Sequence, residues 1–392
     1  MAAAGQYPKF LVDERGTWKP WKGFTAIPSA RKEQAATPAL VKAFEGELLA
    51  LNAILQRAPG VATPTGFSVE TWGNLDSYRQ VEHAPGQPPP GGLPLMGGFA
   101  FGAFPIFEYE RSGKVIREDT GETALQYFAI NQITRPPGDG LLPPEWGQVD
   151  HDAFLQPTPR GEIAGLPRYD DVLVIARDPA SLWAPLTLRA ALDIVVLARQ
   201  ADVAAREERV AAITKQLADA RDPARRASRL ASAEEGAKCM PNPQAFLKEM
   251  AEIWREEEAN LEADLAPTGG AMRALAEAKA ALEEVTMRIA ALSPAEQGAP
   301  SCFAERGSSL STRFRAAPAP GCHPLVRPNY ACFDKSLPRS APQVVLITGI
   351  TRCFDVADKY NRAANDPSPA GCRANRALVE TMDKDAIRAW LR

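Results

Sequence analysis

A stretch rich in alanine, glutamate and arginine, from Thr187 to Leu292, interrupts a chain of 392 residues whose two flanks differ from it in composition. These three residue types are strong helix formers. The flanks instead carry most of the 35 prolines, nearly all the aromatic residues and five of the six cysteines. This contrast predicts a globular body that is interrupted by a helical region.

The helical stretch divides into four predicted helices. Thr187 is a suitable N-cap for the first, and the breaks fall at Asp222–Pro223, at 238–243 and at 267–270. Apolar residues recur every seven positions in the first and last helices, at Val203, Val210 and Leu217 and at Leu275, Leu282 and Ile289. This spacing predicts that the helices pack on one another.

Charged residues of opposite sign gather on two of these helices. Arginines cluster between Arg199 and Arg229, around the end of the first helix, and glutamates cluster between Glu249 and Glu262 in the third. Two interpretations stay open. The two groups form ion pairs between antiparallel neighbours, or each is a solvated face.

The N-terminal flank predicts one helix and several strands. Thr37-Pro38 is a helix start, and Leu40, Phe44, Leu48, Leu51 and Leu55 then recur at helical spacing. Strand-like runs follow at 67–72, 99–109, 114–117, 125–130 and 171–177. Turn signals between the first four of these runs favour antiparallel pairing. Residues 136–167 are rich in proline and glycine and predict a long irregular loop.

The C-terminal flank contains one convincing strand, Gln343–Thr348. A lone strand leaves its backbone donors and acceptors unpaired, so Val344–Ile347 should complete the sheet that begins near Phe67–Ile130. We therefore predict an α+β fold: an antiparallel sheet with a packed N-terminal helix, an inserted antiparallel helical hairpin or bundle, and a disulfide-stabilised C-terminal segment. The predicted domains are residues 1–186 plus 298–392, a discontinuous body, and residues 187–297, an inserted helical subdomain.

The cysteines indicate the compartment. Cys239, Cys302, Cys322, Cys332, Cys353 and Cys372 form no CxxC pair, and an even number in a loop-rich region predicts disulfides in an oxidising compartment. Free buried thiols are the alternative. The first residues, Met-Ala-Ala-Ala, lack the basic and apolar regions of a signal peptide. We therefore expect a periplasmic or secreted protein whose signal peptide has been removed.

The sequence lacks the signals of several classes of function. The net charge is −3 and no basic stretch is interleaved with aromatic residues, so we expect no nucleic-acid binding. No apolar run is long enough for a membrane-spanning helix. The GxSxG, HExxH, Walker A and GxGxxG motifs are also missing.

Two groups of residues remain as site candidates. Asp150, His151 and Asp152 could supply a general base, and His151 and Asp152 could hold a divalent metal. The alternative is a surface loop without chemistry, which the sequence favours because the side chains of adjacent residues rarely point to one place. Trp72, Phe101 and Tyr109 could line an aromatic cleft for a ligand; the alternative is a core face packed against the helix at Leu40–Leu55.

These observations favour an exported binding or interaction protein with a helical protrusion, which takes a protein or a small molecule as its partner. An extracytoplasmic hydrolase with an unfamiliar, metal-assisted site is the first alternative. A homo-oligomeric scaffold that assembles through its helices is the second. The sequence does not decide whether the protein is an enzyme.

Overall fold

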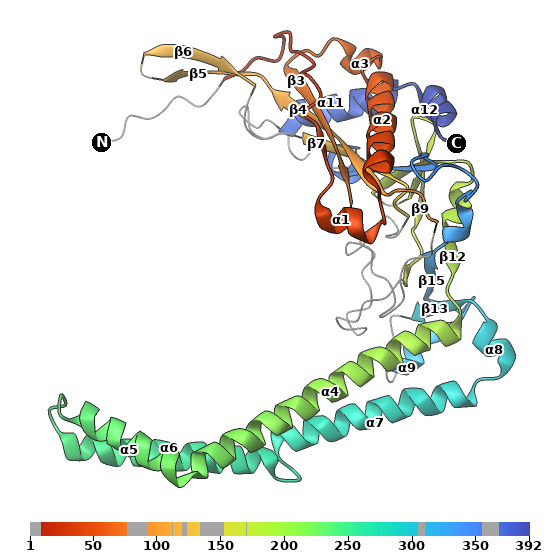
Figure 1. The fold of residues 1–392 in the computed structure, drawn as a ribbon. Helices are drawn as coiled ribbons and strands as arrows, with labels where there is room; N and C mark the ends of the chain where they lie inside the picture. Colours follow the sequence, from red (N-terminus) through yellow and green to blue (C-terminus); the bar gives the residue numbers. More distant parts are fainter. Residues whose placement is uncertain are drawn as a thin grey trace. The chain divides into compact units, whose positions relative to one another are not determined.

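A computed structural model describes residues 9–76, 92–111, 113–119, 124–133, 153–169, 171–304, 310–354 and 368–392. They group into two compact units (Figure 1). The sheet unit comprises Met1–Leu142, Asp150–Leu186 and His323–Arg392, and the helical unit comprises Pro143–Val149 and Thr187–Cys322. The helical unit thus extends beyond residue 297. The division into independently folding domains stays a prediction.

The sheet unit is built on eight strands in the order β2-β3-β4-β7-β16-β11-β10-β9. These are β2 (Phe24–Thr25), β3 (Phe67–Leu75), β4 (Gly97–Pro105), β7 (Ala124–Ile130), β9 (Pro159–Ile163), β10 (Leu166–Tyr169), β11 (Val172–Ala176) and β16 (Val344–Thr348). Every neighbouring pair is antiparallel except β2 with β3. Strand β16 lies between β7 and β11, with Leu346 opposite both Ala129 and Val174. The predicted completion of the sheet by the C-terminal strand is therefore confirmed.

Helices cover one face of this sheet. They are α2 (Pro38–Leu55), α3 (Pro59–Ala62), α11 (Ser368–Thr381) and α12 (Lys384–Trp390), and their apolar residues share one buried cluster with the sheet (Figure 1). Helix α2 begins as predicted, because the Thr37 side chain accepts a hydrogen bond from the backbone N of Leu40 at 3.3 Å. Its Phe44 and Leu48 are fully buried in this cluster with Phe99 and Phe101 of β4.

The other face of the sheet carries a smaller apolar cluster, which includes Met96, Val174 and Leu346. It is covered in part by Leu182 and by residues of β12 (Trp183–Pro185) and β15 (Cys322–Pro328). Strands β12 and β8 (Phe154–Leu155) both pair with β15. The remaining short elements of this unit are α1 (Pro28–Glu33), α10 (Ile350–Phe354) and two 3-10 turns, η3 (Pro179–Leu182) and η4 (Tyr330–Cys332).

The structure refines one prediction about strands and overturns another. The aromatic run is interrupted at its proline: Pro105 ends β4, and β5 (Phe107–Arg111) joins a separate sheet with β1 (Lys9–Phe10) and β6 (Lys114–Glu118). Residues 153–167, expected to be irregular, hold β8, β9 and the start of β10. Strand β9 lies at the edge of the sheet, where a proline is tolerated because no ladder donor is required of it.

The helical unit contains four long helices, α4 (Leu188–Arg221), α5 (Pro223–Ala237), α6 (Pro243–Leu265) and α7 (Gly270–Ala291), and a short α8 (Pro294–Gly298). The side chains of Thr187, Asp222 and Asn242 accept hydrogen bonds from the third residue after each, which fixes the starts of α4, α5 and α6. The predicted helix breaks are thus confirmed. None of the described helices is both long and apolar enough to cross a bilayer.

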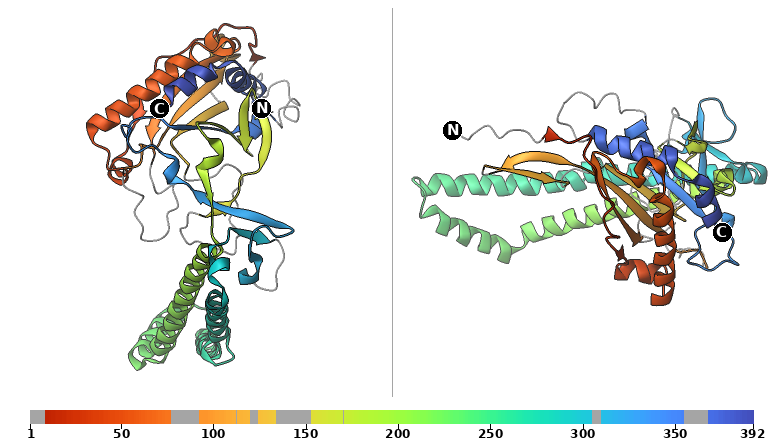
Figure 2. Two further views of the ribbon diagram at one scale, coloured as in Figure 1. Left: turned by 90° about the vertical axis from the view of Figure 1, so that its right-hand side faces the viewer. Right: turned by 90° about the horizontal axis from the view of Figure 1, so that it is seen from above.

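Helices α4 and α7 run side by side (Figures 1 and 2). Their contact buries Ile213 of α4 and Ala278, Val285 and Ile289 of α7. The unit also holds α9 (Leu310–Arg313) and a hairpin of β13 (Ser301–Ala304) with β14 (Phe314–Ala316). Strands β13, β14 and β15 add to the single strand that was predicted for the C-terminal flank.

Two disulfides are present, Cys302–Cys322 in the helical unit and Cys353–Cys372 in the sheet unit. The expectation that all six cysteines are paired was wrong: Cys239 and Cys332 carry free thiols. The reason is that each unit contains three cysteines, so one pair leaves one thiol over in each.

Candidate functional site

The predicted site residues have different outcomes. Asp150, His151 and Asp152 lie outside the described residues, and no group of side chains within the described ranges could hold a metal. Phe101 is fully buried and contacts Trp18 edge to face, with 5.8 Å between the ring centroids. The core interpretation is thus confirmed for Phe101, whose side chain leaves no surface for a ligand. Tyr109 lies on β5, away from the large sheet, and its hydroxyl donates to Glu118 at 2.7 Å.

Trp72 lies on the opposite face of β3 from the helices. It is half-buried, and the Lys22 ammonium lies 5.7 Å from the centroid of its ring. Across the sheet it is in register with Ala100 of β4, which is in register with Tyr127 of β7. Paired residues of adjacent strands share a face, so Trp72 and Tyr127 lie on the same side.

A polar cluster lies at the end of these three strands. Asp76 follows β3, and its carboxylate accepts hydrogen bonds from the Asn74 amide, from the Tyr127 hydroxyl at 3.1 Å and from the Gln132 amide. The Gln132 amide also donates to the Gly97 carbonyl at 2.8 Å. Residues of β3, of β7 and of the segment after β7 therefore donate to one carboxylate, and Gln132 also connects this segment to β4.

The backbone of Asp76 is held as firmly as its side chain. The Gln34 amide donates to the carbonyls of Asp76 and Met96, both at 2.7 Å, and its oxygen accepts from the Met96 N at 2.8 Å. The Arg339 guanidinium in turn donates to the Gln34 carbonyl. Gln34 is almost fully buried, and this network fixes the position of the carboxylate.

A glycine makes room for this cluster. A Cβ atom at Gly98 of β4 would lie 1.7 Å from the hydroxyl oxygen of Tyr127. Because no side chain fits there, the Tyr127 ring can lie over the backbone of β4 and direct its hydroxyl to Asp76.

Burial changes the proton affinities in the cluster. Loss of solvent raises the pKa of Asp76 from 3.8 to about 6, although the hydrogen bonds from Tyr127 and Asn74 oppose the change. Burial also raises the pKa of Tyr127, and the charge of Asp76 acts in the same direction. A carboxylate with a pKa near 6 exchanges its proton close to neutral pH, which is the property of a general base.

Sequence reasoning missed this cluster. Asn74 and Asp76 follow an alternating strand, a pattern that is common where strands end. Tyr127 and Gln132 lie 51 and 56 residues further along the chain. No local pattern shows that they meet Asp76, since the meeting depends on the register of three strands.

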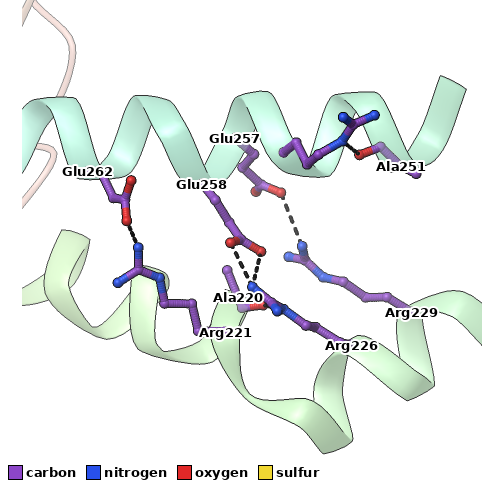
Figure 3. A network of polar contacts seen from close by, with 9 residues as sticks. Ala220, Arg221, Arg226, Arg229, Ala251, Glu257, Glu258 and Glu262 are labelled. Carbon is purple, nitrogen blue, oxygen red and sulfur yellow. Dashed lines mark hydrogen bonds and ion pairs between the residues drawn. The ribbon is translucent and has the colours of Figure 1, made fainter.

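The helical unit offers a second feature, a layer of ion pairs between α6 and its neighbours (Figure 3). Glu258 of α6 accepts from the Arg226 guanidinium at 2.7 and 2.8 Å, and Glu257 accepts from Arg229 at 3.1 Å. Glu262 pairs with Arg221. The interpretation in which the arginine and glutamate groups pair with one another is thus confirmed.

The neighbouring helices cover α6 only in part. None of its 23 residues is buried. Phe246, Met250 and Trp254 are half-buried, and Ile253 exposes 47% of its surface, as does Leu230 of α5.

The chain has been compared with protein-family models, curated proteins and solved structures, and no match was found in any of the three.

Proposed function

We propose that this chain is an exported binding protein whose helical unit carries the binding surface. The observation that carries the proposal is α6, which has 23 residues and buries none of them, although it presents aromatic and aliphatic side chains at helical spacing. Burial of such side chains is the main favourable contribution in helix docking. The two disulfides support the export part, because disulfides persist in oxidising compartments.

The charge of α6 indicates the kind of partner. The helix has seven acidic and two basic residues, a net charge of −5. Glu249 and Glu256 lie four residues before and three after Ile253, hence on the same face, and neither forms an ion pair within the described parts of the chain. An acidic face around an exposed isoleucine suits a basic amphipathic helix of another protein.

The same charge opposes the homo-oligomeric scaffold through this helix. Two copies that met through α6 would bring two helices of charge −5 together, and like charges across an interface are unfavourable. Light scattering at two protein concentrations tests this. A monomer at both concentrations supports a partner other than a second copy of the chain. A dimer that Glu256→Lys disrupts would instead favour the homo-oligomeric scaffold.

The direct test uses a fluorescently labelled peptide that forms an amphipathic helix of leucine and lysine, and a control peptide with glutamate in place of lysine. We expect micromolar binding of the basic peptide alone, measured by fluorescence anisotropy. Glu249→Lys with Glu256→Lys should weaken binding by roughly tenfold or more, since two attractions become repulsions. The matched control, Glu208→Lys on an exposed position of α4, should bind as the unmodified chain does. Equal binding of both peptides would contradict the proposal.

One observation favours an extracytoplasmic hydrolase as a second candidate. The buried Asp76 carboxylate, with its pKa of about 6, has the proton affinity of a base that activates water. A panel of ester, phosphoester and glycoside substrates tests this function: turnover that Asp76→Asn abolishes supports it, and turnover unaffected by Asp76→Asn removes Asp76 from it. A metal site at His151 and Asp152 stays a prediction, which metal analysis of the purified protein tests.

A further inference from the structure

The small sheet of β1, β5 and β6 ends in an exposed strand. Strand β6 is the last in the order β1-β5-β6, and no other described element pairs with its outer side. The hairpin of β5 and β6 extends beyond the large sheet (Figure 1). Val115 exposes 66% of its surface, and Lys114 and Arg117 are exposed as well. The outward N–H and C=O groups of such a strand are a template for pairing with another strand.

One face of this small sheet carries a row of apolar side chains that reaches β6. Phe10 of β1 lies opposite Phe107 of β5, and Tyr109 of β5 lies opposite Ile116 of β6. The ring centroids of Phe10 and Phe107 are 6.2 Å apart, and those of Phe107 and Tyr109 are 5.8 Å apart. All four side chains are only half-buried. Because Ile116 lies on the outermost strand, a further strand at this edge would extend the row.

The sequence of β6 is complementary to itself in the antiparallel direction. When two copies run antiparallel with Ile116 opposite Ile116, Lys114 of each copy lies opposite Glu118 of the other. This register gives two pairs of opposite charge, and both copies contribute the same residues, as a two-fold axis requires. Each residue also faces one that is an even number of positions away, so the backbone groups that point outward on the two copies meet.

Other arrangements of two β6 strands lose this complementarity. Parallel pairing in register sets Lys114 opposite Lys114 and Arg117 opposite Arg117, and like charges directly opposite one another are destabilising. An antiparallel register centred on Arg117 sets two guanidinium groups opposite each other. A register centred on Val115 leaves Glu118 opposite no residue of β6. The register centred on Ile116 is therefore favoured.

The charged residues of β6 are compatible with this pairing. Lys114 forms no ion pair within the described ranges. Glu118 accepts a hydrogen bond from the Tyr109 hydroxyl at 2.7 Å, and a carboxylate can accept several. Arg117 already pairs with Glu108 of β5 at 2.7 Å, so it needs no new partner when it faces Val115 of the other copy.

We propose that two copies of this chain associate through β6, in an antiparallel pair centred on Ile116 that joins their three-stranded sheets into one continuous sheet. The apolar row then continues from one copy to the other, and Lys114 and Glu118 determine the register. The contact is short, so we expect weak association, in the high micromolar range. It uses no residue of α6 and is independent of the binding surface proposed there.

Sedimentation velocity of the full chain at increasing concentration tests the proposal through two charge reversals. Lys114→Glu alone and Glu118→Lys alone should each weaken association roughly tenfold or more, because both facing pairs become pairs of like charge. An equal mixture of the two variants should associate as strongly as the unmodified chain, since each acidic side chain then faces a basic one. This restoration also shows that both variants fold.

Two further variants are controls. Lys9→Glu changes an exposed residue of β1, at the opposite edge of the same sheet, and should leave the association unchanged. Glu256→Lys on α6 should also leave it unchanged, which distinguishes this contact from association through α6. A monomer at every concentration, or a mixture of the two reversed variants that associates no better than each alone, would overturn the proposal.

Discussion

The two units of this protein are stabilised in different ways. In the sheet unit, large side chains such as Phe44, Phe99, Phe101 and Phe128 are fully buried between helices and sheet. In the helical unit, α5 buries only two alanines and α6 buries no residue at all. Caps, helix propensity and surface ion pairs therefore contribute a larger share of its stability. The difference teaches that one unit is built to be stable and the other keeps apolar surface available.

The largest expected difference comes from the same substitution in each unit. Phe101→Ala should lower the free energy of unfolding of the sheet unit by about 3–5 kcal/mol, because it leaves a cavity in a packed core. Phe246→Ala, at a half-buried position of α6, should cost the helical unit about 1 kcal/mol. Urea unfolding, followed by circular dichroism, measures both losses in the free energy of unfolding. Equal losses would contradict the proposed difference between the two units.

The disulfides should contribute in both units. Each closes a loop, of sequence separation 20 or 19, and Cys302→Ser or Cys353→Ser should each lower the free energy of unfolding by about 3 kcal/mol. Urea unfolding of each variant measures this loss.

The two free thiols should differ from each other in reactivity. Cys239 is exposed and should react at once with a thiol reagent. Cys332 should react only after unfolding, because burial raises the pKa of its thiol to about 11. More than two reactive thiols without reductant would contradict this pairing.

The polar cluster should make the sheet unit sensitive to pH. Because burial raises the pKa of Asp76 from 3.8 to about 6, the native state keeps a proton that the unfolded state releases between these values. Stability should therefore fall, by up to about 3 kcal/mol, as the pH rises through this window. Asp76→Asn should flatten this slope, and Asp385→Asn, at an exposed position, should leave it. A slope unchanged in Asp76→Asn would assign it to another group.

The ion pairs of the helical unit should have the smallest effect. A double-mutant cycle on Arg226→Ala and Glu258→Ala should give a coupling energy of about 0.5 kcal/mol, since the Arg226 side chain is mostly exposed. The coupling should decrease in high salt. A coupling above about 2 kcal/mol would mean that this layer, and not the caps and helix contacts, determines the stability of α5 and α6.

Local signals predicted the parts of the fold that depend on neighbouring residues. Thr37-Pro38, Thr187 and Asp222-Pro223 each act on the next few residues, so the helix starts follow from the sequence. The pairing of β16 followed from a general requirement, that the backbone of a strand be satisfied. The helix spacing and the opposite charges of the two groups likewise indicated which helices meet.

Features that depend on distant residues were not accessible in this way. The departure of β5 from the large sheet at Pro105 is set by its pairing with β1 and β6. The choice of disulfide partners depends on which cysteines share a unit. The Asp76 cluster depends on the register of β3, β4 and β7. The requirement for glycine at position 98 follows only from the three-dimensional structure, in which the Tyr127 side chain occupies the space of a Cβ atom.

The most direct test of this account removes residues 191–296 and joins the ends by a short glycine–serine linker. The ends lie close together, since the Leu188 N donates to the Ala299 carbonyl at 2.9 Å. We predict that the remaining sheet unit unfolds cooperatively within about 4 °C of its transition in the full chain, and that binding of the basic peptide is lost. Loss of the cooperative transition, or retention of peptide binding, would contradict the assignment of stability to one unit and binding to the other.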